Sequence, residues 1–399
     1  MNSSRNTVLS ALFSLALLGC SGDTDAGLSY TRSDSAGVTL VMSHGPEWKD
    51  GTEWTITSEP LVQIGVVDGP REYRLDRVLG VTRLADGRIA VLNGGDQELR
   101  FYDRNGAFLQ SVGGEGGGPG ELRRSTGLHR TPGDTLVVAS HADTERSYFS
   151  PTGEFLKRES FPYASLATLL GQVFGCPRRP GLLPDGSYLA CAGIVDQSRD
   201  GSQDLQVSHY LVRVPFSLDW ADTLGVLQGP EFGVNYGSPG TQIASRRDPL
   251  QVFLGDPATF TIAVLEGGRG LVQSIRYPQG ISSVTEDQRQ EYVAYLEEWQ
   301  ADRPNAVLSP PIEDRTTADV KPGFQGLIAD ESGSLWAIRF SPPWDSPQAA
   351  LIFGPEGQLL GEVAFPPGLE ILEVGKDYVL GISRDEFDVE QVAMYQLNR

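Results

Sequence analysis

The hydrophobic residues of this chain recur in short alternating runs, and the clearest set lies between residues 75 and 121. Four such runs cover residues 77–84, 88–92, 98–102 and 107–112. Polar breaks separate the runs, and Asp86-Gly87 has the chemistry of a tight hairpin turn because glycine reaches a positive φ at low cost. Short alternating runs bounded by turn residues are typical of β-strands. The pattern predicts a four-stranded antiparallel sheet.

Comparable units recur downstream at the spacing of a propeller blade. A twisted four-stranded sheet must cover both of its faces, and repetition around an axis does so. In the fourth unit we assign the outer strands to residues 250–254, 259–265 and 271–277. The last unit has only three strands, at residues 369–374, 378–382 and 389–397.

A spare strand at residues 61–65 would supply the missing fourth strand of the last unit. Its pairing with the C-terminal strand would close the ring and hide both sheet edges. The sequence therefore predicts an all-β fold. It is a six-bladed β-propeller with four-stranded antiparallel blades, closed into a ring by an N-terminal strand.

One segment interrupts the β pattern, at about residues 278–322. Thr285 and Gln288 have the spacing of a capping box, and apolar residues from Tyr292 onward recur at helical spacing. Pro304 ends the helix. We therefore expect one helical insertion between blades four and five. As a blade-to-blade connection it would lie over one face of the ring, either as a lid on the channel mouth or packed on the rim.

The first twenty residues differ in character from the rest of the chain. Residues 8–18 form an apolar run that is too short to span a bilayer, and it ends at Gly19-Cys20. This arrangement resembles a bacterial lipobox, in which the cysteine becomes the lipidated first residue after cleavage. An ordinary secretory signal that contains a cysteine is the alternative. We expect residues 1–20 to be a lipoprotein signal peptide with Cys20 as the lipidation site.

The segment that follows is predicted to tether the folded domain to the membrane. Ser21 after the cysteine resembles sorting to the outer membrane. Residues 21–57 would form a flexible tether, rich in small and polar residues, and short N-terminal strands. Residues 58–399 would form the propeller. We therefore expect a lipid-anchored protein of the cell envelope, at the outer membrane, on its periplasmic or its surface side.

Two further cysteines, Cys176 and Cys191, remain after Cys20 is assigned to the lipid. An even number of cysteines in an oxidising compartment favours a disulfide. The alternative is two buried free thiols. We predict a Cys176–Cys191 bridge that clips one blade.

The formal net charge is -20, from 32 basic and 52 acidic residues. This balance argues against a nucleic-acid partner, which needs a basic patch. It also disfavours docking of the folded domain on anionic headgroups, so membrane contact is expected only through the lipid anchor. We expect a monomer with a well-hydrated surface.

Three stretches of the first unit, 86–91, 99–106 and 116–122, resemble an NHL-type repeat. The segment 93–99 departs from the Asn-His-Leu signature because it has no histidine. The C-terminal stretch 377–390 resembles bacterial six-bladed β-propeller lipoproteins. The likeness covers most of residues 60–399. It implies the fold, and since that family is largely of unknown function, it implies no particular chemistry.

In a four-stranded meander, the turns between second and third strands share one face with the blade-to-blade loops. Propellers commonly bind ligands on such a face or in the axial channel. The candidate ligand residues on this face are Asn93, Asp96, Asp143, Glu145, Asp196, Asp200, Asp204, Asp256, Trp344, Asp345, Asp385 and Asp388. We hypothesise an acidic, aromatic-bearing surface that favours cationic groups or a calcium ion. The alternative is that each acid only solvates its own loop.

Other motifs point away from catalysis. The glycine-rich run 113–120 lacks the Gly-Lys-Ser/Thr of a phosphate loop, and we interpret it as an inter-blade turn. His44, His129, His141 and His209 have no metal-ligand spacing. The sequence has no Gly-x-Ser-x-Gly nucleophile elbow.

The sequence therefore favours a module, without assigned catalytic residues or cofactor, that binds a protein, peptide or glycan. The alternative is a calcium-dependent hydrolase or lyase similar in fold to the lactonases. Such an enzyme needs Glu, Asn and Asp side chains around a metal at the channel mouth. Asn93 and Asp96 are the candidates for that role, and the other blades show no matching set.

Overall fold

The structure is a computed structural model of the chain. It describes residues 28–140, 145–160, 172–174, 183–195, 207–215, 217–227, 241–246, 249–303, 319–384 and 389–399.

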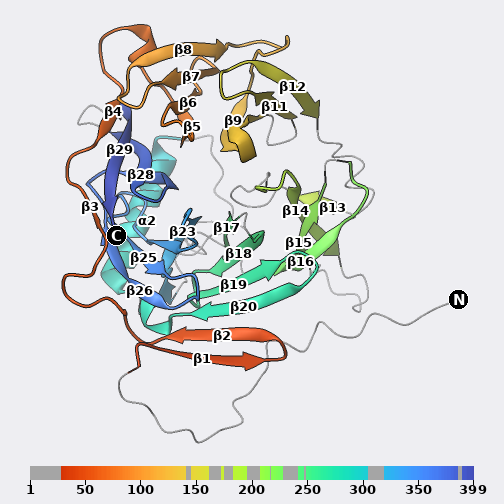
Figure 1. Cartoon of the computed structure of the whole chain (residues 1–399). Helices are drawn as coiled ribbons and strands as arrows, with labels where there is room; N and C mark the ends of the chain where they lie inside the picture. The colour runs from red at the N-terminus through yellow and green to blue at the C-terminus, as the bar shows by residue number, and fades with distance from the viewer. Residues whose placement is uncertain are drawn as a thin grey trace, which may run out of the picture.

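Six sheets, antiparallel except for one strand pair in blade four, surround a central axis (Figure 1). Blade one comprises β5 (Val78–Arg83), β6 (Ile89–Asn93), β7 (Glu98–Tyr102) and β8 (Phe108–Gly113). Blade two comprises β9 (Ser125–Arg130), β10 (Leu136–Ser140), β11 (Glu145–Phe149) and β12 (Phe155–Ser160). Blade three comprises β13 (Gln172–Phe174), β14 (Tyr188–Val195), β15 (Val207–Val214) and β16 (Asp222–Leu227). Blade four contains β17 (Gln242–Arg246), β18 (Gln251–Asp256), β19 (Thr261–Glu266) and β20 (Gly270–Arg276).

Blade five comprises β23 (Phe324–Ala329), β24 (Leu335–Arg339), β25 (Ala349–Phe353) and β26 (Leu359–Ala364). Blade six contains β27 (Glu370–Val374), β28 (Tyr378–Arg384) and β29 (Glu390–Asn398). Within each blade these strands pair in the order in which they follow one another along the chain. The predicted six-bladed propeller with four-stranded blades is confirmed.

The ring is closed by the strand that the sequence predicts. β4 (Val62–Ile64) pairs antiparallel with β29, with Ile64 opposite Val392 and Val62 opposite Met394. Further along β29, the short strand β3 (Thr55–Ile56) pairs with Leu397 and Asn398. The two ends of the propeller therefore share one sheet.

Blade four is wider than the others. β2 (Val38–Ser43) adds to β20 in parallel, and β1 (Tyr30–Ser35) pairs antiparallel with β2, so the sheet has six strands. β1 lies in the stretch expected to be a flexible tether. The hairpin forms because Ala36 and Gly37 both adopt positive φ, 51° and 83°, which suits a two-residue turn between twisted strands.

The hydrophobic core lies between the faces of neighbouring blades. One cluster joins blades six and one and includes Ile64, Val81 and Leu380. Similar clusters join blades one and two, three and four, four and five, and five and six. Strands buried on both faces, such as β6, therefore read as continuous apolar runs.

The predicted helix is confirmed between blades four and five as α2 (Glu286–Ala301), with Thr285 and Gln288 forming the capping box. The short helix η3 (Pro278–Gly280) and the strand pair β21 (Ser282–Ser283) and β22 (Val320–Lys321) flank it. In Figure 1, α2 lies behind the strands of blades five and six. None of the described helices is long and apolar enough to cross a membrane.

Candidate functional site

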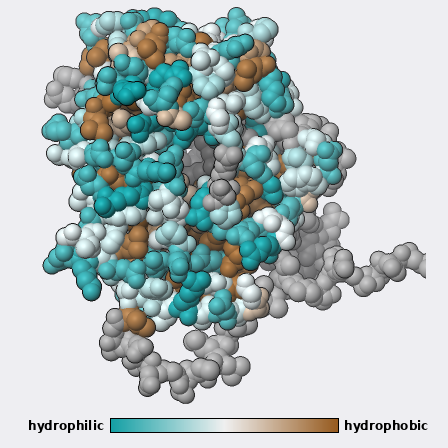
Figure 2. Space-filling view, in the orientation of Figure 1, coloured by the Kyte–Doolittle hydropathy of each residue, from teal (hydrophilic) through white to brown (hydrophobic). Residues whose placement is uncertain are grey.

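The first strands of the blades surround an axial channel. Each first strand begins at the face that carries the blade-to-blade loops and ends at the face that carries the turns to the second strand. We call the cavities at these two ends the upper chamber and the lower chamber. Figure 2 shows the hollow at the centre of one face. Ile328 and Leu372 line both chambers, which therefore meet along the axis.

The upper chamber has a volume of about 930 Å³. Its wall is formed by the starts of first strands, by the β24–β25 connection and by the facing ends of β28 and β29. The apolar residues of this wall include Val78, Ile243, Leu327, Ile371 and Ile382. The polar residues include Gln242, Gln325, Asp345, Glu370, Arg384 and Glu390.

The carboxylates of the upper chamber differ in their partners. Glu390 is neutralised by Arg384 at 2.8 Å and also accepts from the Val78 backbone N–H at 2.6 Å. Asp345 accepts only from the neighbouring Ser346 N–H at 2.8 Å, and the side chain of Glu370 has no hydrogen-bond partner among the described residues. Neither Asp345 nor Glu370 forms an ion pair with a described residue. The chamber therefore presents two uncompensated carboxylates beside an apolar wall.

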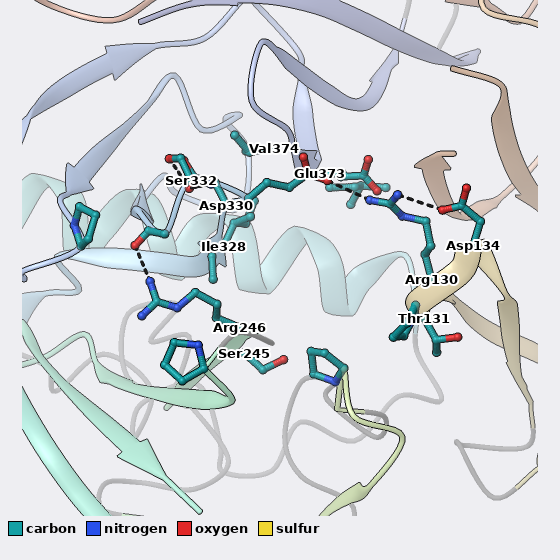
Figure 3. A pocket seen from close by; sticks show the side chains of 18 of the residues that line it. Arg130, Thr131, Asp134, Ser245, Arg246, Ile328, Asp330, Ser332, Glu373 and Val374 are labelled. Atoms are coloured by element: carbon teal, nitrogen blue, oxygen red, sulfur yellow. Dashed lines mark hydrogen bonds and ion pairs between the residues drawn. The ribbon is translucent and has the colours of Figure 1, made fainter. Parts of the chain in front are cut away.

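The lower chamber has a volume of about 690 Å³ and is lined by the ends of first strands and the turns that follow them (Figure 3). Its polar residues include Arg130, Thr131, Asp134, Ser245, Arg246, Asp330, Glu331, Ser332 and Glu373. A smaller cavity of about 280 Å³ adjoins it, and His129 lines that cavity together with Arg130 and Glu373.

Arg130 links opposite sides of the ring. It bonds Asp134 of its own blade at 3.2 Å and Glu331 of blade five at 3.1 Å. Burial alone would lower the pKa of Arg130, but the carboxylates of Glu373, Glu331 and Asp134 together raise it. The Arg130 guanidinium is therefore protonated and positively charged.

Arg246 has a different environment. Its guanidinium donates to the Gly333 carbonyl at 2.8 Å and to the Gln251 side chain, and no described carboxylate lies within ion-pair distance. Its Nε is buried without a hydrogen-bond partner. Burial lowers the pKa of Arg246 by more than the charges of Asp330 and Glu266 raise it, so the cation is only partly compensated.

Glu373 joins blade six to blade one. Its carboxylate accepts hydrogen bonds from the hydroxyls of Thr82 and Tyr378 and from the Arg83 N–H. Burial raises the pKa of Tyr378, and the negative charge of Glu373 raises it further. The phenol therefore remains a hydrogen-bond donor.

Of the residues proposed from the sequence, Asp345 lines a chamber. Its neighbour Trp344 packs on α2, with ring centroids 5.5 Å from Tyr295 and 6.5 Å from Tyr292. No residue of α2 is among the described lining residues of the upper chamber. The helix flanks that mouth through its contact with Trp344.

Asn93 and Asp96 belong to a network away from the channel. Asn93 is buried, and its side-chain oxygen accepts from the Asp76 N–H at 2.8 Å. Asp96 pairs with the buried Arg100 and, at 3.5 Å, with Arg71. These contacts fasten the connection between β4 and blade one.

The remaining candidates are dispersed. Glu145 lies 3.7 Å from Arg158, and Asp256 accepts from the Ala258 N–H and the Thr259 hydroxyl at the start of a turn. Cys191 lies in β14. The candidates outside the described residues are Cys20, Asp143, Cys176, Asp196, Asp200, Asp204, Asp385 and Asp388. Within the described ranges, no three His, Cys, Asp or Glu side chains are arranged to hold a metal ion.

The glycine-rich run connects blades one and two, as expected. The Glu121 carboxylate fills it, accepting from the Gly118 N–H at 2.7 Å. A Cβ at Gly116 would lie 2.1 Å from a Glu121 oxygen, so a larger residue there would displace this carboxylate. The loop holds a carboxylate of its own.

The arginines and acids of the lower chamber are not among the residues predicted from the sequence. One repeat-level signal could have found them: Arg83, Arg130 and Arg246 are each the last residue of a first strand, in blades one, two and four. An arginine at the same position of several repeats points to a shared surface at one end of the axis. No repeated position of this kind marks Glu370 or Glu373 in the sequence.

No protein-family model matches the chain, and no curated protein matches it. Its fold is similar to that of solved structures. A member of the duf4221 family from Bacteroides vulgatus is 10% identical, with a TM-score of 0.50, over 87% of this chain and 98% of that one. A putative exported protein from Bacteroides fragilis is 13% identical, with a TM-score of 0.47, over 90% of this chain and 99% of that one. Virginiamycin B lyase from Staphylococcus aureus is 10% identical, with a TM-score of 0.45, over 87% of this chain and all of that one (100%). Likeness at such identities concerns the fold alone.

Proposed function

We propose that this propeller is a binding module of the cell envelope and that its upper chamber takes a segment of a protein or peptide. The segment would place an apolar side chain in the chamber and a basic group at the mouth. The observation that carries the proposal is the pair of uncompensated carboxylates, Asp345 and Glu370, beside an apolar wall.

The apolar wall supplies the larger part of the affinity. Burial of one leucine-sized side chain stabilises a complex by about 1.5–3 kcal/mol. A partly exposed ion pair adds at most about 1 kcal/mol. The two carboxylates therefore act mainly in selection of a basic ligand, and the net charge of -20 speeds its approach.

The location in the cell envelope follows from the lipobox-like sequence at Cys20. Lipidation there would hold the propeller near a membrane, and the acidic surface would keep the folded domain off anionic headgroups. Globomycin inhibits cleavage of lipoprotein signals, so accumulation of a longer precursor in treated cells is the expected result. A Cys20→Ser variant that still fractionates with membranes would contradict the anchor.

Selection from a random peptide library tests the binding proposal. Immobilised protein should enrich peptides in which lysine or arginine adjoins a large apolar residue. A variant with Asp345→Asn and Glu370→Gln should lose that preference. The matched control, with Glu356→Gln and Glu362→Gln, removes the same charge from exposed acids and should keep it. Enrichment of peptides without basic residues would overturn the proposal.

A further inference from the structure

The lower chamber is electrically polarised. Figure 3 shows Arg130 and Asp134 on one side of it and Arg246 on the other. Around Arg130, three carboxylates face one guanidinium, because Asp134 and Glu331 bond it and Glu373 acts on it through space. Around Arg246 only neutral oxygens are bonded, and the carboxylates of Asp330 and Glu266 act on it through space without an ion pair. The Arg130 end is therefore the more negative of the two, and the Arg246 end keeps a cation with no bonded carboxylate.

Most carboxylates of the lower chamber accept hydrogen bonds from neighbouring residues of the protein. Asp330 is fully buried and accepts from Arg399 at 2.8 Å and from the Trp336 indole N–H at 3.0 Å. Asp134 also accepts from the Ala85 N–H at 2.8 Å. These contacts fix the side chains in place, so neither acid bonds Arg246, and Asp330 acts on it only through space.

Glu331 differs because Arg130 is its sole bonded partner among the described residues. Its side chain is 41% exposed, so it can move to meet an incoming group at small cost. Arg246 likewise has N–H groups to spare, since each of its two terminal nitrogens carries two hydrogens and has one bonded acceptor. Each end of the chamber thus has one group able to accept a ligand of opposite charge.

We propose that the lower chamber binds a small zwitterion, an amino acid or an amine-bearing carboxylate. Its carboxylate would lie on Arg246, whose planar guanidinium suits bidentate pairing. Its ammonium would lie between Glu331 and Glu373. The chamber, at about 690 Å³, has room for such a molecule with several carbons between its charges.

Three probes that share a six-carbon chain test the proposal by calorimetry at constant ionic strength. We expect 6-aminohexanoate to bind at least about tenfold more tightly than hexanoate or hexylamine, because only the zwitterion satisfies both ends. Equal affinity for hexanoate would indicate a simple anion site and would overturn the proposal, and so would the absence of binding.

Two variants locate the ends. Arg246→Gln should weaken 6-aminohexanoate about tenfold and leave hexylamine unchanged, whereas Glu331→Gln should weaken both amines and leave hexanoate unchanged. Glu356→Gln, on an exposed acid paired with Arg32, is the matched control and should change none of the three affinities. Thermal unfolding of each variant without a probe establishes that it folds.

The two chambers meet along the axis, but the charged residues of this proposal are not those of the upper chamber. The Asp345→Asn, Glu370→Gln variant should bind 6-aminohexanoate as the wild type does, so failure of the peptide proposal would leave this result unaffected. If Arg246→Gln binds the zwitterion as tightly as the wild type, the assignment to Arg246 is wrong.

Discussion

The Arg399 guanidinium donates to the buried carboxylate of Asp330 at 2.8 Å, and thereby joins the C-terminal end of blade six to the first turn of blade five. The same guanidinium lies 4.1 Å from the ring centroid of Trp54 and donates to the Gly375 carbonyl at 3.0 Å. One side chain thus connects the N-terminal segment, blade five and blade six.

Replacement of Arg399 by alanine should therefore lower the free energy of unfolding. Loss of one partner of a buried ion pair commonly costs about 3–5 kcal/mol. Asp330 retains other donors, including Trp336 and Ser334, so we expect about 2–3 kcal/mol. Urea unfolding measures it. Arg32→Ala, which breaks an exposed pair with Glu356, should cost at most about 1 kcal/mol, and equal losses in both variants would contradict this account.

The repeat and the closure of the ring could be predicted because they depend on local chemistry. Asp86-Gly87 marks a hairpin by its φ preference, and Thr285 with Gln288 marks a helix start by its hydrogen bonds. The closing strand followed from a count, since a last blade with three strands leaves an edge that needs a partner.

Other elements could not be predicted, because their pattern is set by the tertiary fold. β17, with the sequence QIASR, is mostly polar because it lines the channel, and it reads as a loop. β1, with the sequence YTRSDS, is exposed along most of its length and reads as a tether. The parallel pairing of β2 with β20 joins segments more than two hundred residues apart, which local periodicity does not reveal.

Only part of the candidate site could be predicted from the sequence, because the tertiary fold decides which polar residues reach a chamber. Asp345 was found because it lies in a long polar connection on the expected face. Asn93 and Asp96 also lie in a polar connection on that face, but their side chains do not line a chamber. Asn93 accepts from the Asp76 N–H, and Asp96 pairs with Arg100. Arg130 and Arg246 end ordinary strands, and only the closure of the ring brings them to one chamber.

Ring closure should contribute measurably to stability. Ile64 of β4 is 1% exposed and belongs to the core between blades six and one. Ile64→Ala should lower the free energy of unfolding by about 2–4 kcal/mol, through lost burial and the cavity left behind. Leu61→Ala, at a 55% exposed position next to the same strand, should change it by no more than about 0.5 kcal/mol. Chemical denaturation measures the free energy of unfolding of both variants. If Ile64→Ala leaves it unchanged, ring closure through β4 does not stabilise the fold.

Acid should weaken the fold through Glu98. Burial alone would raise the pKa of Glu98, but hydrogen bonds from Arg71, Ser111 and Arg100 lower it below 4.5. A carboxylate whose pKa is depressed in the folded state stabilises that state above its unfolded pKa. The contribution disappears as the pH falls through the folded pKa.

Glu98→Gln should therefore destabilise the protein at about pH 7, and the difference from the wild type should shrink as the pH falls below about 4.5. Urea unfolding at a series of pH values measures this. Glu362→Gln, at a 50% exposed acid, serves as the control. A difference from the wild type that stays constant from neutral to acid pH would exclude Glu98 as the titrating group.

The contact of Trp344 with α2 should hold the helix beside the upper mouth. Trp344→Ala removes the ring that packs on Tyr295 and Tyr292. We expect faster amide hydrogen exchange in α2, while the strands of blade five keep their protection. Trp220→Ala removes another partly exposed indole, stacked near Arg213, and should leave exchange in α2 unchanged. Equal exchange of α2 in wild type and Trp344→Ala would show that this contact is dispensable.

A double-mutant cycle on a selected peptide tests most directly whether Asp345 and Glu370 recognise a basic group. Calorimetry would compare the peptide with an analogue that carries norleucine in place of lysine, on wild type and on the Asp345→Asn, Glu370→Gln variant. We predict a coupling free energy of about 1 kcal/mol, and a value near zero with the Glu356→Gln, Glu362→Gln control. A coupling near zero with the chamber variant would contradict the account.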